Sequence, residues 1–167
     1  MKRLLKGFLV LLLAACLITL YGYTLPKERT GSAEKQCQAA PKTILATILD
    51  VGSQASWRQS VKAVELKENN SVWIETTQGG EKIKFALLKT DEQAISMKFS
   101  SDSGYEGQWN ARISPTSAGI STVSVTEQVI TQSPLGRIVS RLLFDPEEFS
   151  ENYLNELCKE SMKRALP

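Results

Sequence analysis

The fold is decided by residues 72–89, VWIETTQGGEKIKFALLK, which contain two strand patterns separated by a turn. Ile83, Phe85 and Leu87 alternate with the residues between them, and this period of two places one set of side chains on a buried face. The paired glycines of the segment QGGE accept the positive φ angles that a tight turn requires. The stretch therefore predicts a β-hairpin with one buried face.

The same alternation continues on both sides of this hairpin. Short polar turns, such as SDSG at residues 101–104, separate the alternating segments. Strands are predicted at residues 61–66, 72–76, 82–89, 95–100, 105–113 and 120–129. Because successive hairpins join neighbouring strands, we expect the sheet to be antiparallel.

A long amphipathic segment, residues 134–166, follows the last predicted strand. Ser133 is suited to cap a helix, and Pro134 to occupy its first position. Pro146 lacks an N–H group and crowds the preceding turn, so it should split the segment into two helices. A curved antiparallel sheet that buries one face needs an element to fold around, and this segment supplies it. The predicted fold class is α+β, with room for a cavity.

The segment before the sheet has weaker signals. Residues 27–40 are polar and are interpreted as a linker with a possible first strand around residues 34–38. Pro41 is suited to the first position of a helix that ends near Asp50. Residues 51–57 are then expected to form a loop or a second short helix.

The N-terminal part is strongly apolar, since residues 7–26 form a run of 20 uncharged residues. At about 1.5 Å per residue, such a helix just crosses a hydrocarbon core of roughly 30 Å. Lys2, Arg3 and Lys6 precede the run, which argues that this end stays in the cytoplasm. We therefore expect a single-pass protein of a bacterial inner (cytoplasmic) membrane, with its domain on the periplasmic or extracellular side.

Two other interpretations of this N-terminal run remain open. Residues 13–16, LAAC, resemble a bacterial lipobox, in which Cys16 would be lipidated. The residues after Cys16 are still apolar, whereas lipoproteins usually turn small or polar there, so an uncleaved anchor is preferred. Ala14 and Ala15 also keep a cleavable secretory signal open. The predicted units are residues 1–26 as anchor or signal segment, residues 27–40 as linker and possible first strand, and residues 41–167 as one domain.

Composition excludes several classes of function. The formal net charge is +2, and without the three basic residues before the apolar run the chain has 17 basic and 18 acidic residues. Such a balance offers no basic face for nucleic acid, which is not an expected partner. The chain contains no histidine, which excludes Ser/His/Asp and Cys/His catalysis and imidazole zinc sites. No metal or cofactor is expected.

The cysteines allow a cross-link in the exported part. Cys37 and Cys158 remain there once Cys16 is assigned to the membrane segment, and an oxidising compartment would permit a bridge between them. Two unpaired thiols are the alternative. A short pattern at Asn69 also fits an N-glycosylation acceptor, although three-residue matches are frequent by chance.

Several short motifs, in order and spacing, carry a resemblance to a known family. They are LATILD at residues 45–50, SWR at 56–58, VWIE at 72–75, GQW at 107–109, VTE at 125–127 and SPLGR at 133–137. With them, residues 44–160 resemble the polyketide cyclase/dehydrase and lipid-transport branch of the START-like (SRPBCC), helix-grip superfamily. The resemblance implies a sheet of about seven strands wrapped around a long C-terminal helix, with an apolar pocket between them.

Such a pocket suits a lipid or a polycyclic molecule. Alternation along the strands and the apolar face of the helix select inward-facing candidates for ligand contact. These are Trp73, Phe85, Met97, Trp109, Val139 and Leu142. Their alternative role is ordinary core packing, which would leave nothing to bind.

The preferred function is noncovalent binding of a hydrophobic small molecule or lipid at a membrane surface. An enzyme of the cyclase or dehydrase type is the first alternative, and its sign would be a buried acid or arginine pair lining the pocket. The charged candidates near the matched motifs are Asp50, Arg58, Glu75, Arg112 and Glu127. No catalytic residue is assigned, because a solvated strand or loop position, or a surface ion pair, explains each of these better than catalysis does. A protein-interaction module with a filled pocket is the second alternative.

Overall fold

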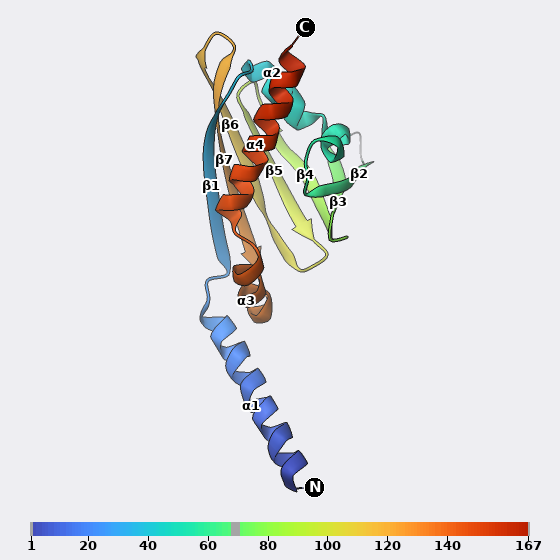
Figure 1. Ribbon diagram of the computed structural model, residues 1–167, viewed down its shortest axis with the longest axis vertical. Helices are drawn as coiled ribbons and strands as arrows, with labels where there is room; N and C mark the ends of the chain where they lie inside the picture. Colours follow the sequence, from blue (N-terminus) through green and yellow to red (C-terminus); the bar gives the residue numbers. More distant parts are fainter. Residues whose placement is uncertain (1, 68–70, 167) are drawn as a thin grey trace.

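The computed structural model of the protein describes residues 2–67 and 71–166. A seven-stranded antiparallel sheet curves around a long C-terminal helix, and an N-terminal helix projects away from the sheet (Figure 1). The predicted α+β class is therefore confirmed. The acceptor pattern that begins at Asn69 lies outside the described residues.

The sheet has the strand order β1-β7-β6-β5-β4-β3-β2. Strands β2 to β7 follow one another as hairpins, and β1 extends the sheet by pairing with β7. The strands span Glu28–Cys37 (β1), Val61–Lys67 (β2), Val72–Thr77 (β3), Lys82–Thr90 (β4), Ala94–Ser101 (β5), Tyr105–Ser117 (β6) and Ile120–Thr131 (β7). All six strands predicted from alternation are confirmed, although β6 and β7 run further than expected.

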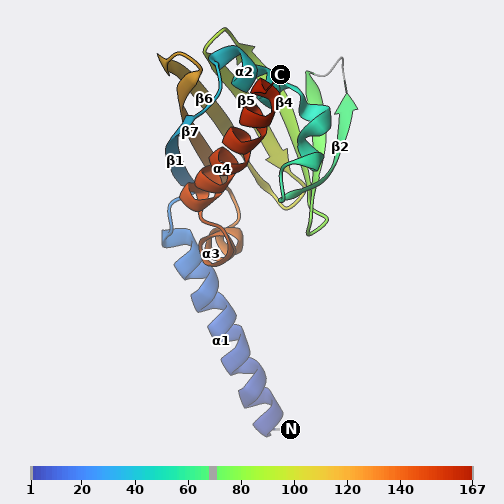
Figure 2. The same ribbon diagram turned by 45° about the horizontal axis from the view of Figure 1, so that its top comes forward.

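Three helices lie on one side of the sheet (Figure 2). They are α2 (Pro41–Leu49), the short 3-10 helix η1 (Val51–Ser56) and α4 (Pro146–Ala165). Helix α3 (Pro134–Leu143) lies at the end of the sheet, next to the N-terminal helix. The Ser133 hydroxyl accepts a hydrogen bond from the Gly136 N–H at 3.2 Å, which confirms the predicted cap. Pro146 starts α4, so the predicted division of the C-terminal segment is also confirmed.

The core lies between the concave face of the sheet and α4 together with α2. On β7, every second side chain from Ser121 to Thr131 is buried, as a half-buried strand requires. Leu154 and Leu157 of α4 are fully buried against this face, and Ile44 and Ile48 of α2 close one end. The packing of α4 against the sheet fixes the position of the interior cavity.

Strand β1 is longer than the sequence predicted, because it spans Glu28–Cys37 instead of residues 34–38. Most of the predicted linker is therefore strand. Only Gly31 and Cys37 of β1 are buried, so the strand has no alternating apolar residues to reveal it. Its pairing with β7 and its contact with α4 hold it in place. Gly31 lies so close to the backbone of Pro146 that a Cβ atom would overlap it.

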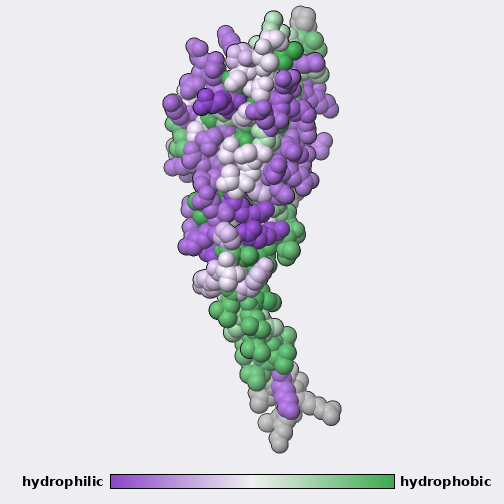
Figure 3. Space-filling model, turned by 90° about the vertical axis from the view of Figure 1, so that its left-hand side faces the viewer, coloured by the Kyte–Doolittle hydropathy of each residue, from purple (hydrophilic) through white to green (hydrophobic). Residues whose placement is uncertain are grey.

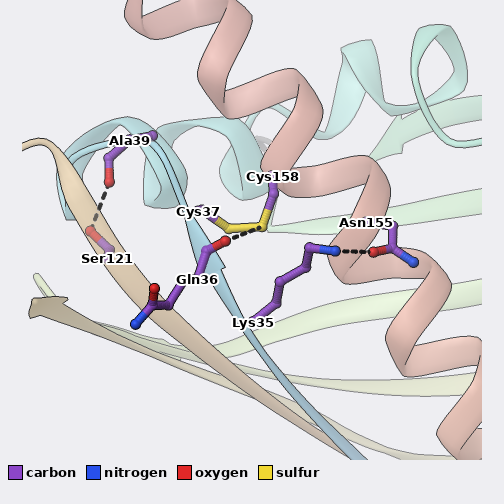
Figure 4. The surroundings of a disulfide bond; sticks show 7 residues. All are labelled: Lys35, Gln36, Cys37, Ala39, Ser121, Asn155 and Cys158. Atoms are coloured by element: carbon purple, nitrogen blue, oxygen red, sulfur yellow. Dashed lines mark hydrogen bonds between the residues drawn. A yellow bond between two sulfur atoms is a disulfide. The ribbon is translucent and has the colours of Figure 1, made fainter.

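A disulfide joins Cys37, at the end of β1, to Cys158 of α4 (Figure 4). The two Cα atoms are 4.8 Å apart, and the bridge closes a sequence separation of 121 residues. Nearby, Lys35 donates a hydrogen bond to Asn155, and the Ser121 hydroxyl donates to the Ala39 carbonyl at 2.8 Å. Of the two alternatives left open by the sequence, the structure contains the bridge.

The first helix, α1 (Lys2–Thr24), extends away from the sheet, and α3 lies where it meets the domain (Figure 1). Its segment Lys6–Thr24 has 19 residues and is long and apolar enough to cross a membrane. Cys16 lies in this helix with an exposed, free thiol.

Candidate functional site

A cavity of about 250 Å³ lies between the concave face of the sheet, η1 and α4. Its wall is formed by side chains from β2 to β7, by Gln54 of η1 and by Phe149 and Tyr153 of α4. Most of these side chains are apolar, but charged groups lie among them: Arg58, Glu75, Glu81 and Glu127. The cavity is therefore an apolar space that contains a few polar groups.

Aromatic rings from neighbouring strands form one wall of the cavity. Trp73 and Phe85 face each other in the β3–β4 register and stack with ring centroids 5.4 Å apart and planes inclined by 7°. The ring centroids of Phe85 and Phe99 are 5.7 Å apart. Trp109 meets Tyr153 of α4 nearly edge-on, with centroids 5.3 Å apart. These flat faces suit a ring-shaped molecule.

Arg58 and Glu75 form a buried ion pair in this wall. The Arg58 Nη1 atom lies 2.9 Å from both carboxylate oxygens of Glu75, and both side chains are over nine-tenths buried. The indole N–H of Trp73 donates a further hydrogen bond to Glu75 at 3.1 Å. Arg58 also donates to Gln54, and its guanidinium lies 5.3 Å from the ring centroid of Tyr153. Both charges are thus satisfied inside the protein.

Glu127 has no such partner. It lies on β7 between Val125 and Val129, is 7% exposed, and its Oε2 atom has no hydrogen-bond partner within the described residues. Burial raises the pKa of this carboxyl from 4.5 to about 7, while the positive charge of Arg58 opposes the rise and the negative charge of Glu75 supports it. At neutral pH this group can therefore either accept or donate a proton.

The substitution Glu127→Gln is expected to stabilise the protein above pH 7. The pKa of Glu127 is higher in the folded protein than in the unfolded chain. The contribution of this carboxyl to the free energy of unfolding is therefore greatest below about pH 4.5 and is lost as the pH rises through about 7. A pKa change from 4.5 to about 7 corresponds to roughly 3 kcal/mol. Glutamine does not titrate, so the variant should lack this loss.

Urea unfolding between pH 4 and pH 8 measures the effect. A matched control is Glu106→Gln, which changes an exposed glutamate on β6 and should keep the wild-type pH dependence. Identical pH profiles for the wild type and Glu127→Gln would contradict the high pKa of Glu127.

Four of the six predicted ligand-contact residues line the cavity. They are Trp73, Phe85, Met97 and Trp109, all on the concave face of the sheet. Alternation along the strands placed them correctly, because successive side chains of a strand point to opposite faces.

The prediction that Val139 and Leu142 point into the cavity is wrong. Leu142 is 77% exposed, and Val139 is half exposed at the edge of a separate groove beneath α3. The break at Pro146 lets α3 leave the face of the sheet, so that α4 and the preceding Phe144, and not α3, cover the cavity beside η1. Phe149 and Tyr153 of α4 occupy the positions expected for the α3 side chains.

The five charged candidates separate into two groups. Arg58, Glu75 and Glu127 meet at the cavity. Asp50 lies at the surface, 2.9 Å from Arg164, and Arg112 is exposed on β6. Within residues 2–67 and 71–166, no group of three or more Asp, Glu or Cys side chains is placed to hold a metal ion.

Comparisons with known proteins identify the fold. No model of a known protein family matches the sequence, and no curated protein matches it. Among solved structures, an aromatase/cyclase from a Streptomyces species is 13% identical, with 83% of this chain and 96% of that chain covered and a TM-score of 0.69. A START superfamily protein from Mycobacterium smegmatis is 17% identical, with 81% and 96% covered and a TM-score of 0.61.

Norcoclaurine synthase from Thalictrum flavum, solved in complex with dopamine and hydroxybenzaldehyde, is a third such structure. It is 12% identical, with 89% of this chain and 94% of that chain covered and a TM-score of 0.65. At such low identities the likeness defines the fold alone. The protein has the START-like helix-grip fold, as the motifs within residues 44–160 predicted.

Proposed function

We propose that the cavity binds a small, largely aromatic molecule that carries a hydrogen-bond donor, without covalent chemistry. The observation that carries this proposal is the unpartnered Oε2 atom of Glu127 within a wall of aromatic rings. A buried acceptor without a partner is destabilising, and a donor group on a ligand would remove that penalty.

The size of the cavity favours a small molecule over a complete membrane lipid. An engineered cavity of about 150 Å³ can bind benzene, and pockets for drug-sized ligands begin near 300 Å³. The volume of about 250 Å³ lies between these values. It suits one or two rings with short substituents. A lipid with two acyl chains would have to leave most of its length outside.

The charges in the wall restrict the ligand further. Arg58 and Glu75 neutralise each other, and Glu127 adds a charge between zero and −1 at neutral pH. Glu81, which accepts a hydrogen bond from Ser101, is a further acidic group in the wall. A neutral donor or an ammonium group therefore suits the site better than a carboxylate or phosphate. Dopamine, which has an amine, and hydroxybenzaldehyde, which is a neutral phenol, are convenient probes of this chemistry.

Titration of each probe into the full-length protein tests the proposal. Trp73 and Trp109 line the cavity, so a bound probe should quench tryptophan fluorescence. Glu127→Gln should weaken dopamine binding by roughly tenfold to a hundredfold, because a hydrogen bond to a charged group contributes about 1.5–3 kcal/mol. Dopamine affinity in the wild type should rise with pH through about 7, as Glu127 ionises.

The matched control for this titration is Glu106→Gln, which should bind both probes as the wild type does. Hydroxybenzaldehyde should lose less affinity than dopamine in Glu127→Gln, since its phenol can still donate to an amide oxygen. Absence of binding by both probes, or equal dopamine affinity in all three proteins, would count against the proposal.

A cyclase- or dehydrase-type enzyme is the second candidate function. A carboxyl with a pKa near neutrality is suited to general acid–base catalysis, and the buried acids and Arg58 lining the cavity are the feature expected of this alternative. Mass spectrometry of dopamine and hydroxybenzaldehyde after incubation separates the two functions. Consumption that depends on Glu127 favours the enzyme, and full recovery favours binding. The filled-pocket interaction module is not proposed, because the interior contains a cavity.

We further propose that α1 stays in the mature protein as a membrane anchor, with the domain on the outer side of a bacterial inner membrane. The disulfide between Cys37 and Cys158 supports this side, because such bonds persist in oxidising compartments. The basic residues before the apolar run support the same orientation. Lipidation of Cys16 is the alternative means of anchoring at the same surface.

A further inference from the structure

Helix α3 turns its apolar face outward. Leu135, Val139, Leu142 and Leu143 fall within about 100° of arc at the helical spacing, which is the width of the stripe that a helix normally buries. Here the four side chains are 51%, 51%, 77% and 80% exposed. Val139 and Leu143 also border the groove between α3 and the sheet, but within the part of the chain that the structure describes no element covers the stripe.

On the opposite side of α3, one polar side chain is buried. Arg137 is 4% exposed, and its guanidinium donates hydrogen bonds to backbone carbonyls at the end of β7 and of α1. The bonds to Gly22 and Leu25 measure 3.4 and 3.2 Å. Because the last carbonyls of a helix have no partner within it, Arg137 acts as a C-terminal cap of α1.

Close packing reinforces this connection between α1 and α3. Gly22 is buried against Pro134, where a Cβ atom would overlap the proline carbonyl. The candidate membrane span ends at Thr24, two residues after Gly22. Helix α3 is therefore held at the level where α1 leaves the hydrocarbon core. Figure 3 shows the hydrophobic surface of α1 beneath the predominantly hydrophilic domain.

We propose that α3 lies in the interface of the same bilayer that α1 spans, with Leu135, Val139, Leu142 and Leu143 inserted at the boundary between headgroups and acyl chains. An interfacial helix characteristically buries such an apolar face by about 5–10 Å. Tyr21 and Tyr23 of α1 are exposed at the same level, where aromatic side chains commonly lie in membrane proteins. The inference rests on the proposed anchoring by α1 and is independent of ligand binding in the cavity.

The substitution Leu142→Trp tests this position of α3 in the full-length protein. The protein is reconstituted into phosphatidylcholine and phosphatidylglycerol vesicles, with and without bromine in the upper part of the acyl chains. Vesicle flotation first establishes anchoring. The matched control is Leu88→Trp, on β4, where a leucine of 51% exposure lies near lysines 84 and 98.

Relative to the wild type, the added emission of Leu142→Trp should shift to shorter wavelength and fall by roughly twofold in brominated vesicles, as expected for a tryptophan at the membrane interface. The added emission of Leu88→Trp should keep its wavelength in vesicles and should not be quenched by bromine. Failure to float with the vesicles would overturn the anchoring and this inference together. Flotation without selective quenching of Leu142→Trp would overturn the inference alone. A blue shift without quenching would mean that a second copy of the chain, and not lipid, covers α3.

Discussion

The substitution Arg58→Met is expected to lower the free energy of unfolding by about 3–5 kcal/mol at pH 7, because it leaves a buried carboxylate without its counter-charge. Glu75 is 3% exposed and would keep only the Trp73 indole as a partner among those described here. Arg58 also opposes the rise in the pKa of Glu127, so that pKa should increase further in the variant. Urea unfolding followed by tryptophan fluorescence measures the loss.

Two comparisons show whether burial of the pair causes this effect. Arg164→Met removes the same type of side chain from exposed ion pairs with Asp50 and Glu160, and it should cost about 1 kcal/mol or less. The double variant Arg58→Met/Glu75→Gln removes both charges and should recover much of the stability. Equal losses in Arg58→Met and Arg164→Met would show that the Arg58–Glu75 pair is hydrated in solution.

Loss of the disulfide is expected to lower the free energy of unfolding by an amount similar to that expected for Arg58→Met. The bridge closes a sequence separation of 121 residues, and the chain-entropy account assigns about 4–5 kcal/mol to a loop of this length. The double variant Cys37→Ala/Cys158→Ala should therefore unfold at a much lower urea concentration than the wild type. Addition of a reductant should lower the urea midpoint of the wild type toward that of the variant, and it should leave the midpoint of the variant unchanged.

Cys16→Ser is the control for this second experiment, because its thiol is free and exposed in α1. It should unfold as the wild type does, and it should keep the response to reductant. If the reductant breaks the bridge and the urea midpoint of the wild type does not change, the predicted stabilisation by the disulfide is wrong. The bridge ties the edge strand β1 to α4, so its loss should also loosen the helix that covers the cavity.

The sheet was predictable because most of its strands alternate apolar and polar residues. Ile83, Phe85 and Leu87 already marked one face of β4, and the other hairpins repeat this pattern. The full length of strand β1 was not predicted, because this strand lies at the edge of the sheet and buries only Gly31 and Cys37. A strand without an apolar face is stabilised by pairing and by contact with α4, and neither is visible in local sequence.

The same alternation could have located the charged part of the site. Glu75 follows Trp73 by two residues, and Glu127 lies between Val125 and Val129 in the period of two. Each glutamate therefore had to share the buried face of its apolar neighbours. What the sequence could not show is that Arg58, from the loop after η1, reaches Glu75 and leaves Glu127 unpaired.

The error on α3 has a different cause. An amphipathic helix shows only that its apolar face is covered by something, and Val139 and Leu142 were assigned to the interior of the domain. The structure instead directs Arg137 inward and the leucines outward, beside α1. This outward direction of the apolar stripe is the basis of the proposed position of α3 at a bilayer surface.

The proposed ligand site depends most on the protonation state of Glu127, and an NMR titration of the Glu127 carboxyl carbon measures this state directly. We predict a midpoint near pH 7 in the free protein, which falls when dopamine saturates the cavity because an ammonium group favours the carboxylate. A midpoint near pH 4.5 that dopamine does not change would contradict the proposed site. Glu127 would then be hydrated, and its carboxylate would not need a hydrogen bond from a ligand.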